Sequence, residues 1–174
     1  MKNNWYVVTG ASCSGKTTIT EALKEMGYKI VPETARALIE SEQAGGLTVQ
    51  EIRKDEKDFQ RRVLQMKIDI ESSLDPNGLV FLDRAIPDTV AYDKLYGVED
   101  NKLLEGSLKM VSYKKVFVLE QLPYSLDEVR IESEEQQKML HTLLRQAYKD
   151  LEMEIIDVPA IPIKERVELI LNNL

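Results

Sequence analysis

Short apolar runs alternate along this chain with longer stretches in which apolar residues return every three or four positions. Five runs rich in β-branched and aromatic residues predict strands, at residues 5–9, 28–31, 79–82, 116–119 and 154–158. Helical spacing predicts helices at residues 15–26, 33–40, 49–74, 87–96, 101–110, 134–151 and from 163 onwards. This alternation predicts an α/β fold in which helices cover both faces of a parallel sheet.

Turn signals separate these elements. Gly27 ends the first predicted helix, and residues 43–46 and 75–78 read as loop and turn. Thr48 is placed to cap the long helix predicted for 49–74, which we expect to keep one solvated face. No repeat or linker interrupts the pattern, and 174 residues suit one domain, so we expect a single domain over 1–174.

Charge and cysteine usage narrow the class of protein. The chain has 23 Lys and Arg residues against 30 Asp and Glu residues, which gives a net charge of −7. Because it also lacks a long basic block, we expect no nucleic-acid partner. The pair Arg61-Arg62 is read as a solvated helix face in preference to a binding patch. Cys13 is either a small tolerated residue or a redox-sensitive thiol. Without a signal peptide or membrane-spanning run, we expect a cytoplasmic protein, monomer or homodimer, with no membrane contact.

A phosphate-binding pattern lies between the first strand and the first helix. Residues 10–17 read G-A-S-C-S-G-K-T, which matches G-x-x-x-x-G-K-[S/T]. A glycine-rich turn can direct several N–H groups inward while the next helix points its positive end at the same place. Lys16 would reach the β- and γ-phosphates, and the Thr17 hydroxyl would bind Mg²⁺. The expected nucleotide-binding residues are Gly10, Ser12, Cys13, Ser14, Gly15, Lys16, Thr17 and Thr18.

Polar residues follow the apolar run at 79–82. Asp83 is expected to meet Mg²⁺ directly or through water, with a helix N-cap as the alternative. Arg84 could hold a substrate phosphate or brace the sheet. Asp88, one turn on, is either a polar residue lining the substrate site or a solvated helix residue.

Glu33 and Arg36 follow the run at 28–31 and lie one helical turn apart. They could face the substrate crevice, with Glu33 as a general base or orienting group, or form an exposed intrahelical ion pair. Arg130, in a lid segment near residues 120–135, could fold over the triphosphate, or form a surface salt bridge to Glu134 or Glu135. His141 is interpreted as structural, because no partner for metal or nucleophile chemistry accompanies it.

These motifs together resemble the small single-domain AAA-type predicted ATPases related to nucleoside and nucleotide kinases. The Asp83-Arg84 pair is similar to that of deoxynucleoside and thymidylate kinases, and the Glu-x-x-Arg at Glu33 and Arg36 to that of nicotinamide riboside kinases. The resemblance implies a P-loop three-layer sandwich with strand order 2-3-1-4-5. It also implies that Lys16 and Thr17 bind the triphosphate and Mg²⁺, that Asp83 is the catalytic or metal-linked carboxylate, and that Arg130 is the lid residue. Glu33 and Arg84 would then contact the acceptor, and Lys16, Asp83, Glu33 and Arg130 are the expected catalytic residues.

The leading hypothesis is therefore transfer of the γ-phosphoryl group from Mg-ATP to a small nucleoside- or nucleotide-like acceptor. ATP is preferred to GTP because no Asn-Lys-x-Asp signature is present. Nucleoside-triphosphate hydrolysis and a nucleotide-dependent switch remain as alternatives. Phe59-Gln60-Arg61-Arg62 matches no single base-reading pattern, so the acceptor's identity stays open.

Overall fold

A five-stranded parallel sheet forms the centre of the computed structural model, which describes residues 3–122 and 133–174. The strands are Trp5–Thr9 (β1), Lys29–Val31 (β2), Val80–Asp83 (β3), Lys115–Leu119 (β4) and Ile155–Val158 (β5). Their order in the sheet is β2-β3-β1-β4-β5, and every neighbouring pair is parallel. The expected fold class and strand order are both confirmed.

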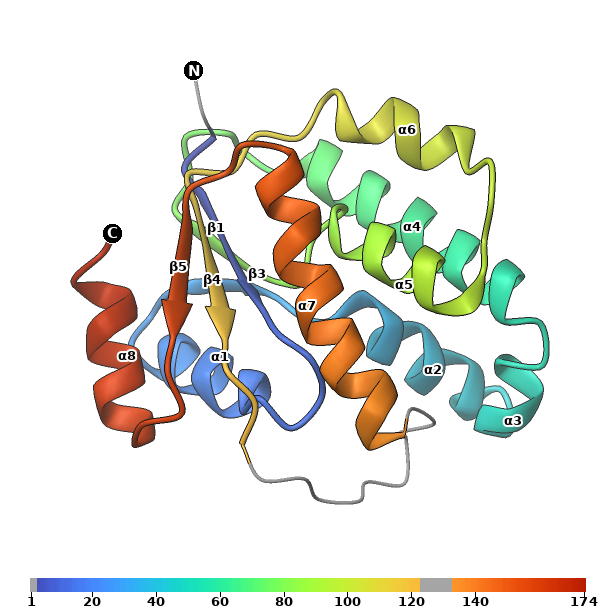
Figure 1. Ribbon diagram of the computed structural model, residues 1–174, viewed down its shortest axis with the longest axis horizontal. Coiled ribbons are helices and arrows are strands. Elements are labelled where there is room, and N and C mark those ends of the chain that lie inside the picture. The colour runs from blue at the N-terminus through green and yellow to red at the C-terminus, as the bar shows by residue number, and fades with distance from the viewer. Residues whose placement is uncertain (1–2, 123–132) are drawn as a thin grey trace.

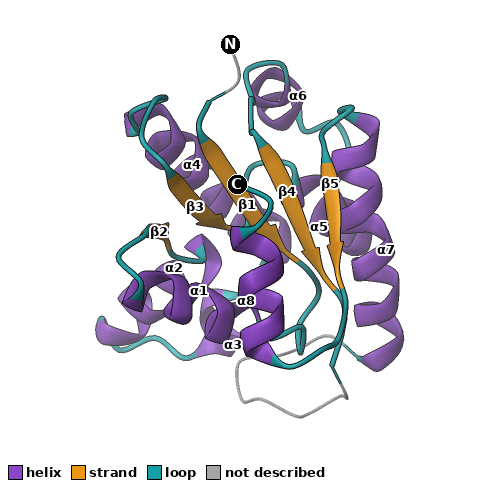
Figure 2. Ribbon diagram, turned by 90° about the vertical axis from the view of Figure 1, so that its left-hand side faces the viewer, coloured by secondary structure: helices purple, strands orange, loops and turns teal. Residues whose placement is uncertain are grey.

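Helices cover both faces of this sheet (Figure 1). They are Lys16–Glu25 (α1), Thr34–Ala44 (α2), Val49–Ile52 (α3), Glu56–Ser73 (α4), Asp88–Tyr96 (α5), Lys102–Leu108 (α6), Glu134–Asp150 (α7) and Ile163–Leu171 (α8). Figure 2 shows α1 and α8 on one side of the sheet and α4, α5 and α7 on the other. Within the described ranges, no helix is long and apolar enough to cross a membrane.

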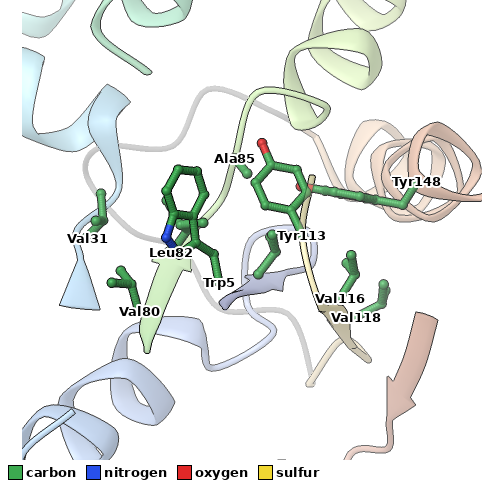
Figure 3. Packing of buried hydrophobic residues seen from close by; sticks show 10 residues of the cluster. Trp5, Val31, Val80, Leu82, Ala85, Tyr113, Val116, Val118 and Tyr148 are labelled. Carbon is green, nitrogen blue, oxygen red and sulfur yellow. The ribbon is translucent and has the colours of Figure 1, made fainter. Parts of the chain in front are cut away.

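The two faces of β1 explain why its sequence is apolar without interruption. Trp5 and Val7 point into the cluster beneath α4 and α7, which Figure 3 shows. Tyr6 and Val8 point the other way and pack against α1 and α8. Successive side chains of a strand alternate in direction, so a central strand covered on both faces must be apolar at every position. Each large side chain buried in this way contributes about 1.5–3 kcal/mol.

The segment at 49–74 differs from the expected single helix. It forms α3 and α4, with a break in which Asp55 has an extended backbone (φ −112°, ψ 97°). The Asp55 side chain accepts a hydrogen bond from the Asp58 N–H at 3.1 Å and so caps a new helix. The break also lets Ile52 and Phe59 pack into one cluster with residues of α2.

Three strand ends meet at one edge of the sheet. In the pairing register Val8 of β1 lies beside Asp83 of β3, and Val31 of β2 lies beside Leu82 of β3. The residues that follow β1, β2 and β3 are therefore brought together. The carboxyl edge of an open parallel sheet is where ligands bind in folds of this class.

Candidate active site

The loop between β1 and α1 has a backbone that requires glycine at both ends of the motif. Gly10 has a φ of 148°, and a Cβ atom there would lie 2.7 Å from the carbonyl oxygen of Leu119. Gly15 has a φ of 79°, and its Cβ would lie 3.3 Å from a methyl carbon of Leu122. Backbone and side chains from the β4 side thus approach the loop too closely for larger residues.

Two carbonyl groups of the loop are held by donors from outside it. The Leu122 N–H donates to the Cys13 carbonyl at 2.8 Å, and Arg166 Nη1 donates to the Ser14 carbonyl at 2.6 Å. In a trans peptide the C=O and the following N–H point in opposite directions. The N–H groups of Ser14 and Gly15 therefore point away from these donors, and neither donates to an acceptor among the described residues. They are free to bind a phosphate.

Lys16 folds back over the same loop. Its Nζ donates to the carbonyls of Gly10 at 3.0 Å and Ala11 at 3.2 Å, and only 8% of the residue is exposed. Burial, and then repulsion by Arg84, lower the pKa of Lys16 to about 8. A bound polyanion would raise that pKa, because negative charge favours the charged amine. Thr17, next along, is exposed at the start of α1.

Asp83 ends β3 and is buried beneath the loop, with 5% of the residue exposed. Burial, and then the negative charge of Glu33, raise the pKa of Asp83 to about 6. Its Oδ1 has no hydrogen-bond donor in the part of the chain that the structure describes. A buried carboxylate oxygen without a partner suits Mg²⁺ or a Mg²⁺-bound water, with the Thr17 hydroxyl as a second ligand.

The donor set suits this metal in a further respect. The described ranges contain no cluster of three or more His, Cys, Asp or Glu side chains that could hold a metal ion. Mg²⁺ usually keeps several waters and is bound by one or two protein groups together with substrate phosphates. A site of one carboxylate and one hydroxyl therefore fits Mg²⁺ that arrives with a nucleotide.

Glu33 and Arg84 form a partly buried ion pair across the ends of β2 and β3, in which the Arg84 side chain is buried and that of Glu33 is partly exposed. Arg84 Nε donates to Glu33 Oε1 at 3.0 Å, and the guanidinium lies 5.3 Å from the ring centre of Tyr92. Burial would raise the pKa of Glu33, but the charges of Arg84 and Lys16 and the hydrogen bond from Arg84 lower it to about 2. Glu33 is therefore ionised at neutral pH.

Arg36 lies one turn into α2 and is exposed at the same cavity as Glu33. Glu33 occupies the N-cap position of α2, yet its side chain makes no capping hydrogen bond. The Glu33 carboxylate is held by Arg84, which lies at the end of the neighbouring strand β3. Glu33 and Arg36 both line this cavity, and their role toward an acceptor stays a prediction.

Asp88 lies behind the cavity and does not line it. It is fully buried, so the solvated alternative is wrong. Its carboxylate accepts hydrogen bonds from Thr9 Oγ1, from Tyr148 Oη and, at 2.8 Å, from the Ala85 N–H. It also lies 3.5 Å from Arg84 Nη1. Asp88 is therefore positioned to stabilise the Arg84 guanidinium from behind the cavity.

One cavity of about 360 Å³ joins the phosphate loop to α2, α4 and α5. Its size falls in the usual range for small-molecule sites. The loop contributes Ser12, Cys13, Ser14, Gly15, Lys16, Thr17 and Thr18. The remaining lining residues are Glu33, Ala35, Arg36, Ile39, Arg53, Phe59, Gln60, Val63, Lys67, Arg84, Tyr92 and Leu122. The phosphate loop and a partly apolar chamber between α2, α4 and α5 are therefore continuous.

Sequence reasoning missed several of these lining residues. Lys67 is 5% exposed, and its Nζ donates to the Ala85 carbonyl at 3.0 Å and Thr89 Oγ1 at 3.3 Å. Burial lowers the pKa of Lys67. The available signal was its spacing, because Lys67 and Glu71 follow Val63 at intervals of four residues on the buried face of α4. Arg166, which contacts the phosphate loop from outside the cavity, was also missed, and no sequence motif marks it as a contact of that loop.

Arg130 lies outside the described residues, as does most of the lid segment expected near 120–135. Its role on the triphosphate stays a prediction. His141 lies in α7, where burial lowers its pKa. Its interpretation as a structural residue stays a prediction.

Comparison with known proteins gives one family and a set of similar folds. The family model described as an AAA domain matches residues 5–166. No curated protein matches the sequence significantly. Deoxyadenosine kinase from M. mycoides, solved with dCMP and dCDP, superposes with a TM-score of 0.68 at 20% identity over 97% of each chain.

Two further solved structures have the same fold. The NadR protein in complex with NR has a TM-score of 0.67 at 23% identity, over 88% of this chain but 43% of NadR. Thymidylate kinase from Candida albicans has a TM-score of 0.60 at 15% identity, over 99% of this chain and 91% of that one. The expected resemblance to kinase-like P-loop proteins is confirmed at the level of fold.

Proposed function

The chain belongs to the AAA-domain family, and we propose that it transfers the γ-phosphoryl group of Mg-ATP to a small nucleoside- or nucleotide-like acceptor. The observation that carries this proposal is the single cavity that joins the phosphate loop to a chamber between α2, α4 and α5. Transfer to an acceptor needs two adjoining subsites, whereas hydrolysis needs only the first. The nucleosides and nucleotides bound in the similar structures support an acceptor of this class.

The phosphate loop supplies the charge that the triphosphate requires. The N–H groups of Ser14 and Gly15 would bind phosphate oxygens, and Lys16 would leave the loop carbonyls to reach the β- and γ-phosphates. Thr17 and Asp83 would hold Mg²⁺, and the ion would supply positive charge that offsets the charge of the triphosphate. The N–H groups of Ser14 and Gly15 are already oriented before a nucleotide binds, and preorganised donors of this kind are a main source of catalysis in phosphoryl transfer.

Glu33 is placed to orient the acceptor. Its carboxylate lines the cavity, is ionised, and is fixed by Arg84, so it can accept a hydrogen bond from an acceptor hydroxyl. Its low pKa makes it a weak base, but little proton abstraction is needed before a loose phosphoryl-transfer transition state. Asp83 is the alternative carboxylate for this task, in a mode in which it does not ligate Mg²⁺. Arg84 and Arg36 would contact the acceptor from the same side.

The test is incubation of the protein with Mg-ATP and a panel of nucleosides, nucleotides and sugar-like alcohols, following phosphate release and acceptor mass together. We expect one panel member to gain a phosphoryl group. Glu33→Gln should lower turnover about 100-fold or more and leave ATP binding intact. Lys16→Ala should abolish the product through weaker triphosphate binding.

Glu40→Gln is the matched control, because Glu40 lies exposed on α2 and does not line the cavity. Its turnover should equal that of the unaltered protein. Phosphate release without a phosphorylated acceptor would identify a hydrolase instead. Nucleotide binding without either reaction would identify a switch.

A further inference from the structure

Arg166, in the first turns of α8, is the largest fully buried side chain of the described residues, with 1% exposed. Arginine is rarely buried to this degree without a carboxylate partner. In the described part of the chain Arg166 forms no ion pair. The protein therefore keeps a buried positive charge where an apolar side chain would avoid the cost of desolvation.

The Arg166 guanidinium binds three backbone carbonyls from three separate loops. Nε donates to Pro159 at 2.7 Å, Nη1 to Ser14 at 2.6 Å, and Nη2 to Glu120 at 2.9 Å. These carbonyls follow β5, β1 and β4, which are three neighbours in the sheet. A planar fork of donors can serve three acceptors at fixed angles, and a lysine ammonium on its flexible stem cannot reproduce that geometry.

The contact with Ser14 acts on the phosphate loop itself. The Ser14 carbonyl and the Gly15 N–H belong to one trans peptide, so holding the carbonyl outward directs the N–H inward. Nη1 also lies 3.2 Å from the place where a Cβ on Gly15 would stand. The guanidinium thus lies directly behind the peptide that faces a bound phosphate.

We propose that Arg166 is a positioning residue for the triphosphate, which locks the Ser14–Gly15 peptide in its phosphate-binding orientation and adds positive charge from behind the loop. Oriented backbone donors cost no reorganisation when the ligand binds, and a buried charge near them is weakly screened. The proposal rests on the phosphate site of the proposed function and is independent of the acceptor.

Calorimetric titration of Arg166→Met and Arg166→Lys with Mg-ATP and with inorganic tripolyphosphate tests this role, at a temperature well below each variant's unfolding midpoint. We expect Arg166→Met to weaken both ligands by about tenfold or more, the effect of losing a charged hydrogen bond. Arg166→Lys keeps the charge and should fall between. Arg145→Met is the control, because Arg145 pairs with Asp157 at the end of β5 and makes no contact with the phosphate loop.

A second readout separates positioning from mere packing. In ¹⁵N-labelled protein the Gly15 amide resonance should move on addition of tripolyphosphate, and that movement should be reduced in Arg166→Lys. If either folded Arg166 variant binds tripolyphosphate as tightly as the unaltered protein, the proposal is wrong, whatever happens to the unfolding midpoint. If the unaltered protein binds neither ligand, the phosphate site itself is wrong.

Discussion

Single residues at this site are held in states that they would not adopt alone. Lys16 has a lowered pKa, Asp83 a raised one, and Glu33 is ionised in spite of its burial. Burial lowers the pKa of Lys16 and raises that of Asp83, whereas the charges of Arg84 and Lys16 lower that of Glu33 against the effect of burial. Clusters of perturbed groups of this kind are typical of functional sites. The sequence pointed to Lys16, Asp83 and Glu33, but the sizes of their pKa shifts depend on packing that no motif encodes.

Gly10 is the residue at which backbone shape is most constrained. Gly10→Ala would place a methyl group 2.7 Å from the Leu119 carbonyl and 2.9 Å from Ser14 Oγ, at a φ of 148°. We expect the free energy of unfolding to fall by about 1–3 kcal/mol, measured by urea denaturation.

Gly106→Ala is the control, because it makes the same glycine-to-alanine substitution at a position where the added methyl group meets no neighbouring atom. Gly106 lies in α6, where an added Cβ meets nothing within 4 Å. Alanine there should raise the free energy of unfolding by up to about 1 kcal/mol. If Gly10→Ala were as stable as the unaltered protein, the loop would have to relax without cost.

Among the elements, α4 departs most from its sequence-based interpretation. Residues 49–74 have helical periodicity throughout, and the Thr48 cap was predicted correctly. Hydrophobic periodicity shows which residues face the core. It cannot detect a break between two helices, such as α3 and α4, when the apolar residues on both sides of the break still face the same core. The capping carboxylate of Asp55 was the available local signal. The charged residues Lys67 and Glu71 on the inner face of α4 were also missed, because charged residues of this segment were assigned to its solvated face.

Glu71 of α4 links the helix to two other segments. Its carboxylate accepts hydrogen bonds from the Ile86 N–H at 3.1 Å and from Tyr113 Oη at 2.6 Å. Burial raises the pKa of Glu71 from 4.5 to about 7. Between those pH values the unfolded chain loses this proton and the folded chain keeps it, so rising pH favours unfolding.

Glu71→Gln should remove this contribution. Relative to the variant, we expect the unaltered protein to lose roughly 3 kcal/mol of unfolding free energy between about pH 4.5 and 7. Tyr113→Phe removes a hydrogen bond that lowers the same pKa, so the loss should extend to higher pH. Urea denaturation across this range measures both effects. Parallel pH profiles for Glu71→Gln and the unaltered protein would contradict the assignment.

At the scale of the whole molecule, charge is distributed unevenly. The chain has a net charge of −7, yet the cavity is lined by five basic side chains and one carboxylate. The basic residues are Lys16, Arg36, Arg53, Lys67 and Arg84. Strand order was predictable because the motifs resemble a known group. The chamber was not, because its walls come from α2, α4 and α5, whose mutual packing no local pattern specifies.

This distribution predicts how Mg-ATP binding responds to salt. If the cavity's positive charge guides the nucleotide, raising NaCl from about 20 to 200 mM should slow association by about 3- to 10-fold in stopped-flow measurements. Lys138→Gln, an exposed change on α7 away from the cavity, should leave that dependence unaltered. Faster association at high salt would mean that the overall negative charge dominates.

The hydrogen bond from Arg166 to Ser14 spans 152 residues of sequence. During synthesis the phosphate loop leaves the ribosome early, and the side chain that holds it follows only when α8 has been made. Contacts so distant in sequence form late, after the intervening chain has been ordered. A growing chain that lacks α8 therefore also lacks the side chain that fixes the Ser14–Gly15 peptide. If Arg166 has the role proposed above, nucleotides would stabilise such a chain less than one that includes α8.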